Sequence, residues 1–284
     1  MIIVTGATGA LNGATVDHLL EHLPASEIVV VARDTARAGR FARRGVQVRR
    51  GDYAEPNSLP AAFAGADQLL LVSSNDPAAD APALHRAAID AAVTAGVKRI
   101  LYTSHQASAP DNPFVPGRDH FVTEQLLAAS GVPWTSLRNG FYAHSLPLLA
   151  GPWHETGVIA VPGDGPVSWT AREDAAEAAA AVLISDGAYD GPVTLTAPAA
   201  PTFAEIAELA SELSGRTIRH QLMDERDWCA ARLAAGQPEH MVHFLLGFYR
   251  AARGGYFAGV DPLLGELLGR RPRTVRDVLR ATTA

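Results

Sequence analysis

The chain has 284 residues, of which 48% are hydrophobic and 19% are charged. This composition is sufficient for a sizeable hydrophobic core and excludes an intrinsically disordered chain. Its formal charge of -6 disfavours nucleic acid as a partner. A single cysteine, Cys229, forms no internal disulfide, and no signal-peptide pattern or apolar stretch of about 20 residues is present. We therefore expect a cytoplasmic protein that does not associate with membranes.

Short apolar runs alternate with amphipathic stretches through the first half of the chain. Strands are expected at residues 2–5, 28–32, 46–49, 68–72, 99–102 and 134–137. Helices are expected between them at residues 14–22, 35–44, 56–63, 81–95 and 119–129. Val-, Ile- and Leu-rich strands that alternate with helices are typical of βαβ units with right-handed crossovers. We predict an α/β fold in which residues 1–139 form a doubly wound, Rossmann-like parallel sheet.

Beyond Asn139 this alternation is lost, and residues 139–170 are rich in Gly and Pro. The later elements are expected to be strands at 158–161 and 193–196 and helices at 172–184, 202–213, 225–235 and 239–253, followed by a terminal segment at 272–279. Thr202 and Glu205 have the spacing of a capping box, and Gly215 is expected to end their helix in a left-handed conformation. We predict that residues 140–284 form a smaller substrate-binding α/β lobe, with the chain interleaving between the lobes.

A glycine-rich segment, Gly6-Ala7-Thr8-Gly9-Ala10-Leu11-Asn12-Gly13, lies between the first strand and the first helix. Glycine permits the tight turn and the close approach of a pyrophosphate, and the helix N-terminus offers unpaired N–H groups. The residues predicted to bind the pyrophosphate are Gly6, Thr8, Gly9, Ala10, Leu11 and Asn12. The usual spacing has a third glycine at position 12, where Asn12 can donate to a phosphate but can also crowd the helix–sheet contact.

Arg33 stands at the end of the second strand, where NAD-binding folds place an acidic residue, and Arg37 follows it. A guanidinium there suits the 2′-phosphate, so we predict NADP(H) as the cofactor. NAD(H) is the alternative because Asp34 is adjacent, and Arg33 can also be read as a solvated loop charge.

Further cofactor contacts are predicted where the next strands end. Asp52 and Tyr53 follow the third strand and are expected to border the adenine, with Asp52 accepting from its amino group. Ser73, Ser74 and Asn75 follow the fourth strand and are expected along the ribose and pyrophosphate, and Thr103 and Ser104 follow the fifth.

These landmarks resemble the atypical short-chain dehydrogenase group that includes NmrA-like proteins, among them type 2 NAD(P)H:quinone oxidoreductases and triphenylmethane reductases. The motifs that carry the resemblance include Thr5-Gly6-Ala7-Thr8-Gly9, Val31-Ala32-Arg33, Gly51-Asp52-Tyr53, Tyr102-Thr103-Ser104, Thr123-Glu124 and Arg138-Asn139-Gly140. The resemblance implies two lobes, a nicotinamide that faces the cleft between them, and direct hydride transfer to a stacked acceptor. The chain departs from the pattern at Asn12 and at residues 140–144.

A catalytic acid is less clearly marked, because the Tyr-x-x-x-Lys pair of ordinary short-chain dehydrogenases is absent. We predict His120, Asn139 and Tyr142 as the catalytic residues. His120 is a candidate general acid or, equally, a structural helix-start residue. Phe141 and Tyr142 can stack on a flat acceptor or plug the lobe junction, and Asn139 is expected to fix cofactor or loop geometry.

The favoured hypothesis is an NAD(P)H-dependent reductase of quinones or similar small aromatic acceptors. A tailoring enzyme for aromatic polyketides and a non-catalytic NADP-sensing regulator are the alternatives. A homodimer is an assembly that the sequence allows. His240 and His243 share a helix face without an evident third ligand, so no metal site is predicted. The arginines at positions 270, 271 and 273 are expected in a solvated turn.

Overall fold

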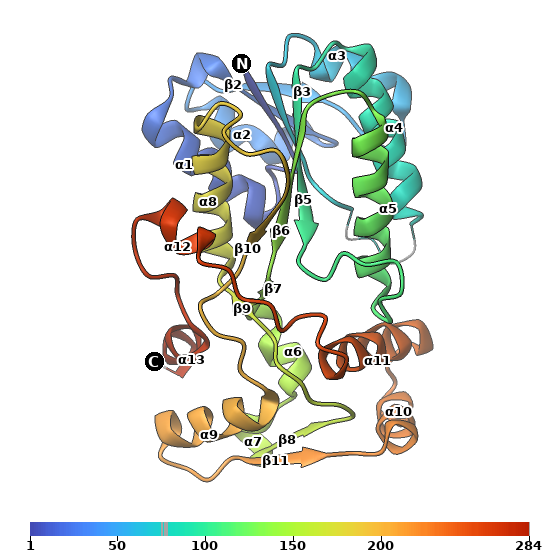
Figure 1. Cartoon of the computed structure of the whole chain (residues 1–284), viewed down its shortest axis with the longest axis vertical. Helices are drawn as coiled ribbons and strands as arrows, with labels where there is room; N and C mark the ends of the chain where they lie inside the picture. Colours follow the sequence, from blue (N-terminus) through green and yellow to red (C-terminus); the bar gives the residue numbers. More distant parts are fainter. Residues whose placement is uncertain (75, 77–78, 284) are drawn as a thin grey trace. The chain divides into compact units, whose positions relative to one another are not determined.

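The computed structural model describes residues 1–74, 76 and 79–283 (Figure 1). The strands are β1 (Ile2–Thr5), β2 (Ile28–Ala32), β3 (Gln47–Arg50), β4 (Gln68–Leu71), β5 (Arg99–His105), β6 (Trp134–Asn139), β7 (Phe141–Tyr142), β8 (Val158–Val161), β9 (Trp169–Thr170), β10 (Gly191–Leu195) and β11 (Arg219–Leu222). The longer helices are α1 (Ala10–His22), α4 (Ala81–Thr94), α5 (Val115–Ala129), α8 (Arg172–Ile184), α9 (Phe203–Ser214), α10 (Glu225–Ala234), α11 (Glu239–Arg253) and α13 (Val275–Thr283). The shorter ones are η1 (Ala25–Glu27), η2 (Thr35–Ala38), α2 (Gly39–Ala42), η3 (Pro56–Ser58), α3 (Leu59–Phe63), η4 (Ala143–Ser145), α6 (Leu146–Ala150), α7 (Trp153–Thr156) and α12 (Leu263–Leu268). Within these described residues, each helix is too short or too polar to cross a membrane.

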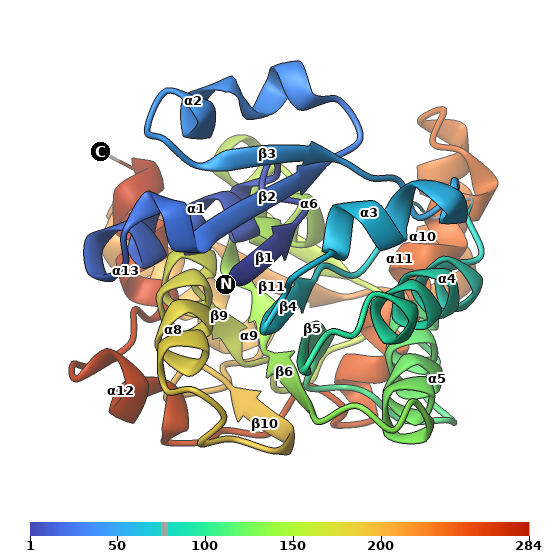
Figure 2. The same ribbon diagram turned by 90° about the horizontal axis from the view of Figure 1, so that it is seen from above.

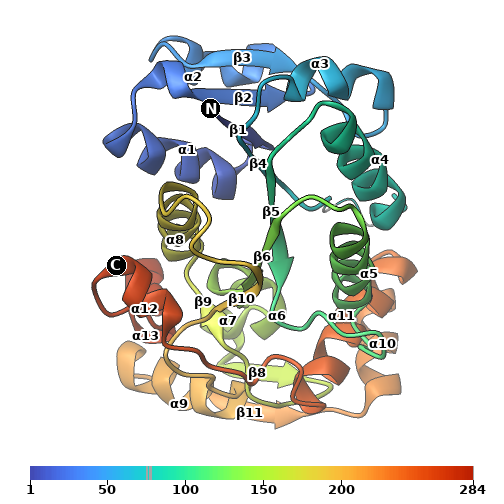
Figure 3. The ribbon, with the colours of Figure 1, turned by 45° about the horizontal axis from the view of Figure 1, so that its top comes forward.

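Seven strands form one sheet in the order β10-β6-β5-β4-β1-β2-β3. β1 pairs in parallel with β2 and β4, so that Ile3 lies between Val29 and Leu69. β1, β2 and β4 are buried along their whole length, which explains their nearly continuous apolar sequences. Helices α1 and α8 cover one face of the sheet, and α3, α4 and α5 cover the other (Figures 2 and 3). The predicted doubly wound α/β fold is confirmed.

The chain folds into two compact units, each built from separate segments. Unit 1 consists of Met1–Ser104, Asp119–Arg138 and Ala175–Val193. Unit 2 consists of His105–Arg118, Asn139–Asp174 and Thr194–Ala284. Each unit is described by itself below.

Most predicted elements form, although the boundaries of several differ, and two of these differences have local reasons. The helix expected over residues 35–44 is divided into the 3-10 helix η2 and the short α2, which begins at Gly39, a residue that weakens a continuous helix. Helix α1 begins at Ala10 rather than at residue 14, because Gly9 is its N-cap with an extended backbone. The end of the glycine-rich segment is therefore the first turn of α1.

Unit 2 is organised around a cluster of aromatic rings. Phe248 of α11 has its ring centroid 4.6 Å from that of Phe141 and 5.2 Å from that of Phe257. Trp169 and Phe203 belong to the same buried core. Phe141 is thus occupied by core packing, and only the neighbouring Tyr142 stays a candidate platform for a flat acceptor.

The local signals predicted for α9 are confirmed in unit 2. Thr202 and Glu205 form a reciprocal capping box at its N-terminus, and Gly215 follows its last turn with φ +66°. Both features satisfy backbone groups that the helix itself leaves without partners. The helix therefore begins and ends where its sequence predicts.

The arginines at positions 270, 271 and 273 are exposed, as predicted, but two of them also pair with a buried carboxylate. Asp174, at the start of α8, has no exposed surface and contacts both Arg270 and Arg273. Its carboxylate accepts from the Arg270 guanidinium at 3.0 Å and from the Arg273 backbone N–H at 2.6 Å. A buried carboxylate needs such partners, so this segment is fixed to α8 rather than loose in solvent.

Candidate functional site

The glycine-rich loop after β1 has the geometry of a site for a phosphate group. Gly6 adopts a left-handed φ of +65°, and a Cβ at this position would lie 2.5 Å from Val72 Cγ1. Thr8, Gly9 and Ala10 are exposed, and no side chain caps the described N-terminus of α1 at Gly9. The first-turn N–H groups therefore face a surface that lacks side-chain competitors, and the loop fits a pyrophosphate.

Asn12 and Gly13 together replace the third glycine that is usual in such a loop. Asn12 is buried, and its Nδ2 donates to the Thr5 carbonyl at 2.8 Å, which ties the start of α1 to the end of β1. A Cβ on Gly13 would lie 2.8 Å from the Ala7 carbonyl oxygen, so Gly13 provides the close contact expected of the missing glycine. In this geometry we expect Asn12 to support the loop from inside rather than donate to a phosphate.

The charged residues that follow β2 have different surroundings. The Asp34 carboxylate accepts from the Ala36 N–H at 3.0 Å and thereby caps the N-terminus of η2. Arg33 and Arg37 are exposed, and neither guanidinium has a hydrogen bond or ion pair within the part of the chain that the structure describes. This arrangement favours a phosphate over a ribose 2′-hydroxyl as the group bound after β2.

Asp52 and Tyr53, predicted beside the adenine, have different surroundings. Asp52 Oδ1 accepts from the Ala54 N–H at 3.0 Å within an exposed turn. The Tyr53 hydroxyl lies 2.7 Å from Thr5 Oγ1 and donates to the Val72 carbonyl at 3.2 Å. Burial raises the pKa of this phenol well above its ordinary value, so the hydroxyl stays protonated. Tyr53 braces the phosphate loop against the segment after β4.

The serine and threonine residues after β4 and near the end of β5 bond to one another and to buried groups. Thr103 and Ser104 belong to β5 itself, because this strand extends to His105 rather than ending before them. The Ser73 N–H donates to Thr103 Oγ1 at 2.8 Å, and the Ser74 N–H donates to His85 Nε2 at 2.8 Å. Ser104 is buried and donates to Glu124 at 2.8 Å. Ser73 and Ser74 are partly exposed, whereas Thr103 and Ser104 are buried beneath the surface. The predicted contact of Asn75 lies outside the described residues.

The three predicted catalytic residues fall in different units. His120 of unit 1 is half-buried, and its Nδ1 lies 2.8 Å from the Tyr102 hydroxyl. Asn139 and Tyr142 belong to unit 2, where Asn139 Nδ2 donates to the Tyr142 hydroxyl at 3.1 Å. Burial raises the pKa of Tyr142 well above its ordinary range, so this phenol is a hydrogen-bond donor rather than a base.

Sequence reasoning missed a buried carboxylate in α5. Glu124 accepts from Ser104 and Ser136 at 2.8 and 2.7 Å, and its two oxygens accept from Arg138 at 3.0 and 2.5 Å. Burial raises the pKa of Glu124, but the Arg138 and Ser136 hydrogen bonds outweigh it and hold the pKa below its ordinary value. The Thr123-Glu124 and Arg138-Asn139 motifs, quoted only for family resemblance, were the signal for this pair.

One buried and one half-buried histidine make the folded state sensitive to acid. Burial lowers the pKa of His85 in unit 1 and of His105 in unit 2 to about 4. The unfolded chain binds these protons first, so the stabilisation is complete above pH 6.5 and is lost as the pH falls towards 4. We expect the free energy of unfolding to drop by about 3 kcal/mol per histidine across this window. Urea titrations at pH 7, 6 and 5 check this, and a flat profile would contradict it.

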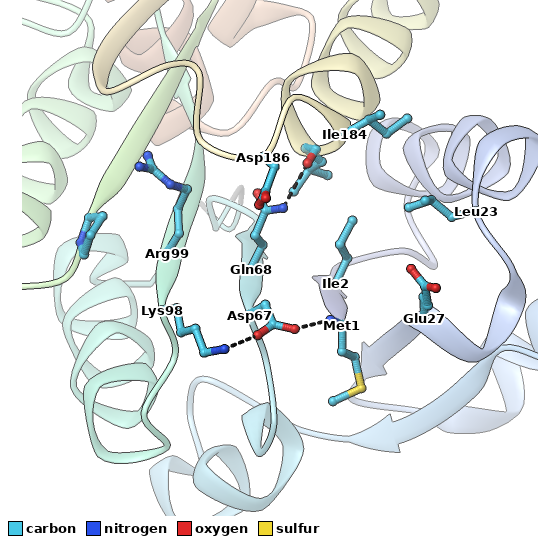
Figure 4. Close-up of a pocket in the computed structure, with 12 residues that line it drawn as sticks. Met1, Ile2, Leu23, Glu27, Asp67, Gln68, Lys98, Arg99, Ile184 and Asp186 are labelled. Atoms are coloured by element: carbon cyan, nitrogen blue, oxygen red, sulfur yellow. Dashed lines mark hydrogen bonds and ion pairs between the residues drawn. The ribbon is translucent and has the colours of Figure 1, made fainter.

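A pocket of about 550 Å³ lies at the opposite edge of unit 1, where strands begin (Figure 4). Ile2, Gln68 and Arg99 open their strands along it, and Asp67 joins Lys98 to the Met1 ammonium. Parallel sheets bind ligands outside the carboxyl ends of their strands, so this pocket is distinct from the predicted cofactor edge. Among the described residues, the structure brings together no three His, Cys, Asp or Glu side chains that could hold a metal ion.

Comparison with known proteins decides the family. The model of the NmrA-like family matches residues 1–262. The chain belongs to the NmrA-like family. The resemblance inferred from its motifs is therefore confirmed.

Relatives of this NmrA-like protein align over nearly the whole chain. Quinone oxidoreductase 2 of Escherichia coli (strain K12) is 36% identical over 280 residues, which cover 98% of this chain and 96% of the relative. An NAD(P)H azoreductase of Xenophilus azovorans is 34% identical over 286 residues, with 100% and 98% covered. The crystal structure of the NADPH-dependent quinone oxidoreductase of E. coli, complexed with NADPH, has a TM-score of 0.90 at 33% identity, covering 100% of both chains. That of Citrobacter sp. triphenylmethane reductase complexed with NADP(H) has a TM-score of 0.87 at 32% identity, again over 100% of both chains.

Proposed function

We propose that this NmrA-like protein is an NADPH-dependent reductase that transfers hydride to a quinone or a similar flat aromatic acceptor. Its class, an NAD(P)H-dependent oxidoreductase with NADP(H) as cofactor, follows from relatives that are quinone, azo-compound and triphenylmethane reductases. The observation that carries the proposal is the glycine loop at Gly6, whose left-handed turn is followed by the exposed and uncapped N-terminus of α1. The exposed Arg33 after β2 supports the phosphorylated dinucleotide.

Different residues of the chain are proposed to bind the cofactor and to assist hydride transfer. Backbone N–H groups at the start of α1 bind the pyrophosphate, and Arg33 binds the 2′-phosphate. Bound NADPH supplies the hydride. Addition of hydride to a quinone gives a stabilised phenolate, so the protein needs to position the acceptor and donate a hydrogen bond to its oxygen. His120 and Tyr142 are the proposed donors, and Asn139 orients Tyr142.

Steady-state NADPH oxidation tests the proposal with a panel of benzoquinones, naphthoquinones and azo dyes. We expect oxidation that depends on the acceptor and is faster with NADPH than with NADH. Tight binding of NADP(H) without turnover of any acceptor would instead favour the sensing regulator. Oxygen uptake with a polycyclic phenol, independent of NADPH, would favour the polyketide tailoring enzyme.

Replacing Arg33 with alanine tests the choice of cofactor. The guanidinium is expected to make charge-assisted hydrogen bonds worth about 1.5–3 kcal/mol, so NADPH should bind about 10- to 100-fold more weakly. NADH affinity should stay unchanged because NADH has no 2′-phosphate. Calorimetry with both dinucleotides measures this. Arg50→Ala is the matched control, because Arg50 is also exposed but pairs with Glu55. Equal loss of NADPH and NADH affinity in Arg33→Ala would contradict the assignment.

A further inference from the structure

A chain of hydrogen bonds runs through the interior of unit 1 behind His120. It joins His85 of α4, Tyr102 of β5 and Thr123 of α5, three side chains that are at most 1% exposed. His85 Nδ1 lies 2.8 Å from Thr123 Oγ1 and 3.4 Å from the Tyr102 hydroxyl, which in turn lies 2.8 Å from His120 Nδ1. The positions of the hydrogens along this chain follow from counting donors and acceptors.

The first step fixes the tautomer of His85. The Thr123 hydroxyl donates its hydrogen to the Asp119 carbonyl at 2.8 Å, so its oxygen accepts from His85 Nδ1. His85 Nδ1 therefore carries a hydrogen. Its Nε2 accepts from the Ser74 N–H at 2.8 Å and carries none. Both ring nitrogens have partners in this neutral form, and burial, which lowers the pKa of His85 to about 4, keeps it neutral.

The second step concerns the hydrogen of the Tyr102 hydroxyl. His85 Nδ1 already carries a hydrogen and cannot accept another. His120 Nδ1 lies 2.8 Å from the phenol oxygen, so the phenol donates there. The Thr123 side chain is a second hydrogen-bond partner of the phenol, but its oxygen already accepts from His85, so donation to His120 Nδ1 gives each buried hydrogen an acceptor of its own. Burial raises the pKa of Tyr102 well above its ordinary value, so the hydrogen is retained.

We propose that Tyr102, itself held by His85, is a positioning residue that keeps His120 neutral with its hydrogen on Nε2. His120 then acts as a neutral hydrogen-bond donor to the acceptor oxygen and not as a general acid, because a neutral imidazole can polarise an oxygen without giving up its proton. The acceptor gains hydride to become the phenolate, and water supplies the proton that completes the hydroquinone. This inference rests on the proposed function of His120.

Charged and titratable groups surround this chain of hydrogen bonds. Glu124 and Asp119, both on α5, raise the pKa of Tyr102, as does Tyr53 from the segment after β3. The Glu124 charge is balanced by Arg138. Asp119 precedes His120 in α5, and a carboxylate near an imidazole favours the imidazolium, so the donation from Tyr102 to Nδ1 must outweigh this effect.

Nitrogen NMR of protein labelled with ¹⁵N-histidine tests the tautomer without any turnover. Long-range ¹H–¹⁵N spectra should show the His120 hydrogen on Nε2 and no protonation of Nδ1 between about pH 6 and pH 8, with the His120→Gln variant providing the assignment. In Tyr102→Phe, the His120 pKa should rise towards its ordinary value. Tyr256→Phe, which removes an exposed hydroxyl in unit 2, should leave the His120 signals unchanged. A His120 that titrates near pH 6.5 or above in the unaltered protein would overturn the proposal.

Kinetics provide a second and separate readout. A glutamine amide can donate a hydrogen bond but cannot act as an acid, so His120→Gln should keep kcat within about tenfold of the unaltered protein. His120→Ala should lose about 10²- to 10³-fold in kcat. If both variants fold and lose activity equally, His120 is a proton donor and the inference is wrong. If no acceptor is reduced by any variant while the NMR result holds, the proposed function fails and the tautomer assignment stands.

Discussion

Replacement of Glu124 with glutamine should lower the free energy of unfolding by about 3–5 kcal/mol. The carboxylate is 3% exposed and accepts hydrogen bonds from β5 and β6, through Ser104, Ser136 and Arg138. A neutral amide leaves the half-buried guanidinium without its counter-charge and turns one acceptor into a donor. Breaking one partner of a buried ion pair is among the most destabilising single changes in a protein.

Urea denaturation measures this loss, and two variants show where it comes from. Glu212→Gln removes a carboxylate of the exposed pair with Arg276 and should leave the free energy of unfolding almost unchanged. The double change Glu124→Gln with Arg138→Gln should be less destabilised than the sum of the two single changes, because both buried charges are then removed. A Glu124→Gln loss as small as that of Glu212→Gln would show that the pair does not hold α5 to the sheet.

Replacement of Gly6 with alanine should weaken NADPH binding by about 100-fold or more, which corresponds to about 2.7 kcal/mol. The left-handed φ of +65° costs an L-residue about 1–2 kcal/mol, and the new Cβ would meet Val72 Cγ1 at 2.5 Å. The loop must move to relieve both, and its N–H groups then lose their alignment with a pyrophosphate. Titration calorimetry with NADPH measures the effect.

Two further variants separate the causes of this loss. Gly39→Ala is the matched control, because its backbone is helical and its new Cβ would lie 3.6 Å from the nearest side-chain atom, so NADPH affinity should not change. Combining Gly6→Ala with Val72→Ala removes the 2.5 Å contact with Cγ1 but keeps the 3.0 Å contact with the Cβ of residue 72 and the strained φ, so it should recover part of the affinity. Undiminished NADPH binding in Gly6→Ala alone would place the pyrophosphate elsewhere.

The first half of the fold was predictable from local signals. β1 and β2 have the predicted bounds, because buried parallel strands read as continuous apolar runs. The capping box at Thr202 likewise predicted where α9 begins. Short strands such as β7 and β9 were not predictable, because two residues carry no periodicity and their pairing depends on tertiary contacts.

Part of the candidate site was likewise predictable from the sequence, and part was not. The glycine loop and Arg33 were visible because their chemistry depends on residues that are close in sequence. His85, Tyr102 and Glu124 were missed because each acquires its role from helices and strands brought together only by folding. The sequence leaves open whether Phe141 stacks on the acceptor or fills a junction, because an aromatic residue in a sequence gives no sign of whether its ring faces a ligand or a core.

The interleaved path of the chain limits how this protein can be made and divided. Unit 1 includes Ala175–Val193, so a ribosome must deliver just over two thirds of the polypeptide before the nucleotide-binding half can be completed. A fragment that stops at Asn139 would lack α8, whose Leu183 carbonyl accepts from the buried Gln68 at 2.9 Å, and would leave β6 as a bare edge. Such a fragment should aggregate during translation, and insertions intended as fusion points belong in surface turns rather than at the apparent midpoint of the sequence.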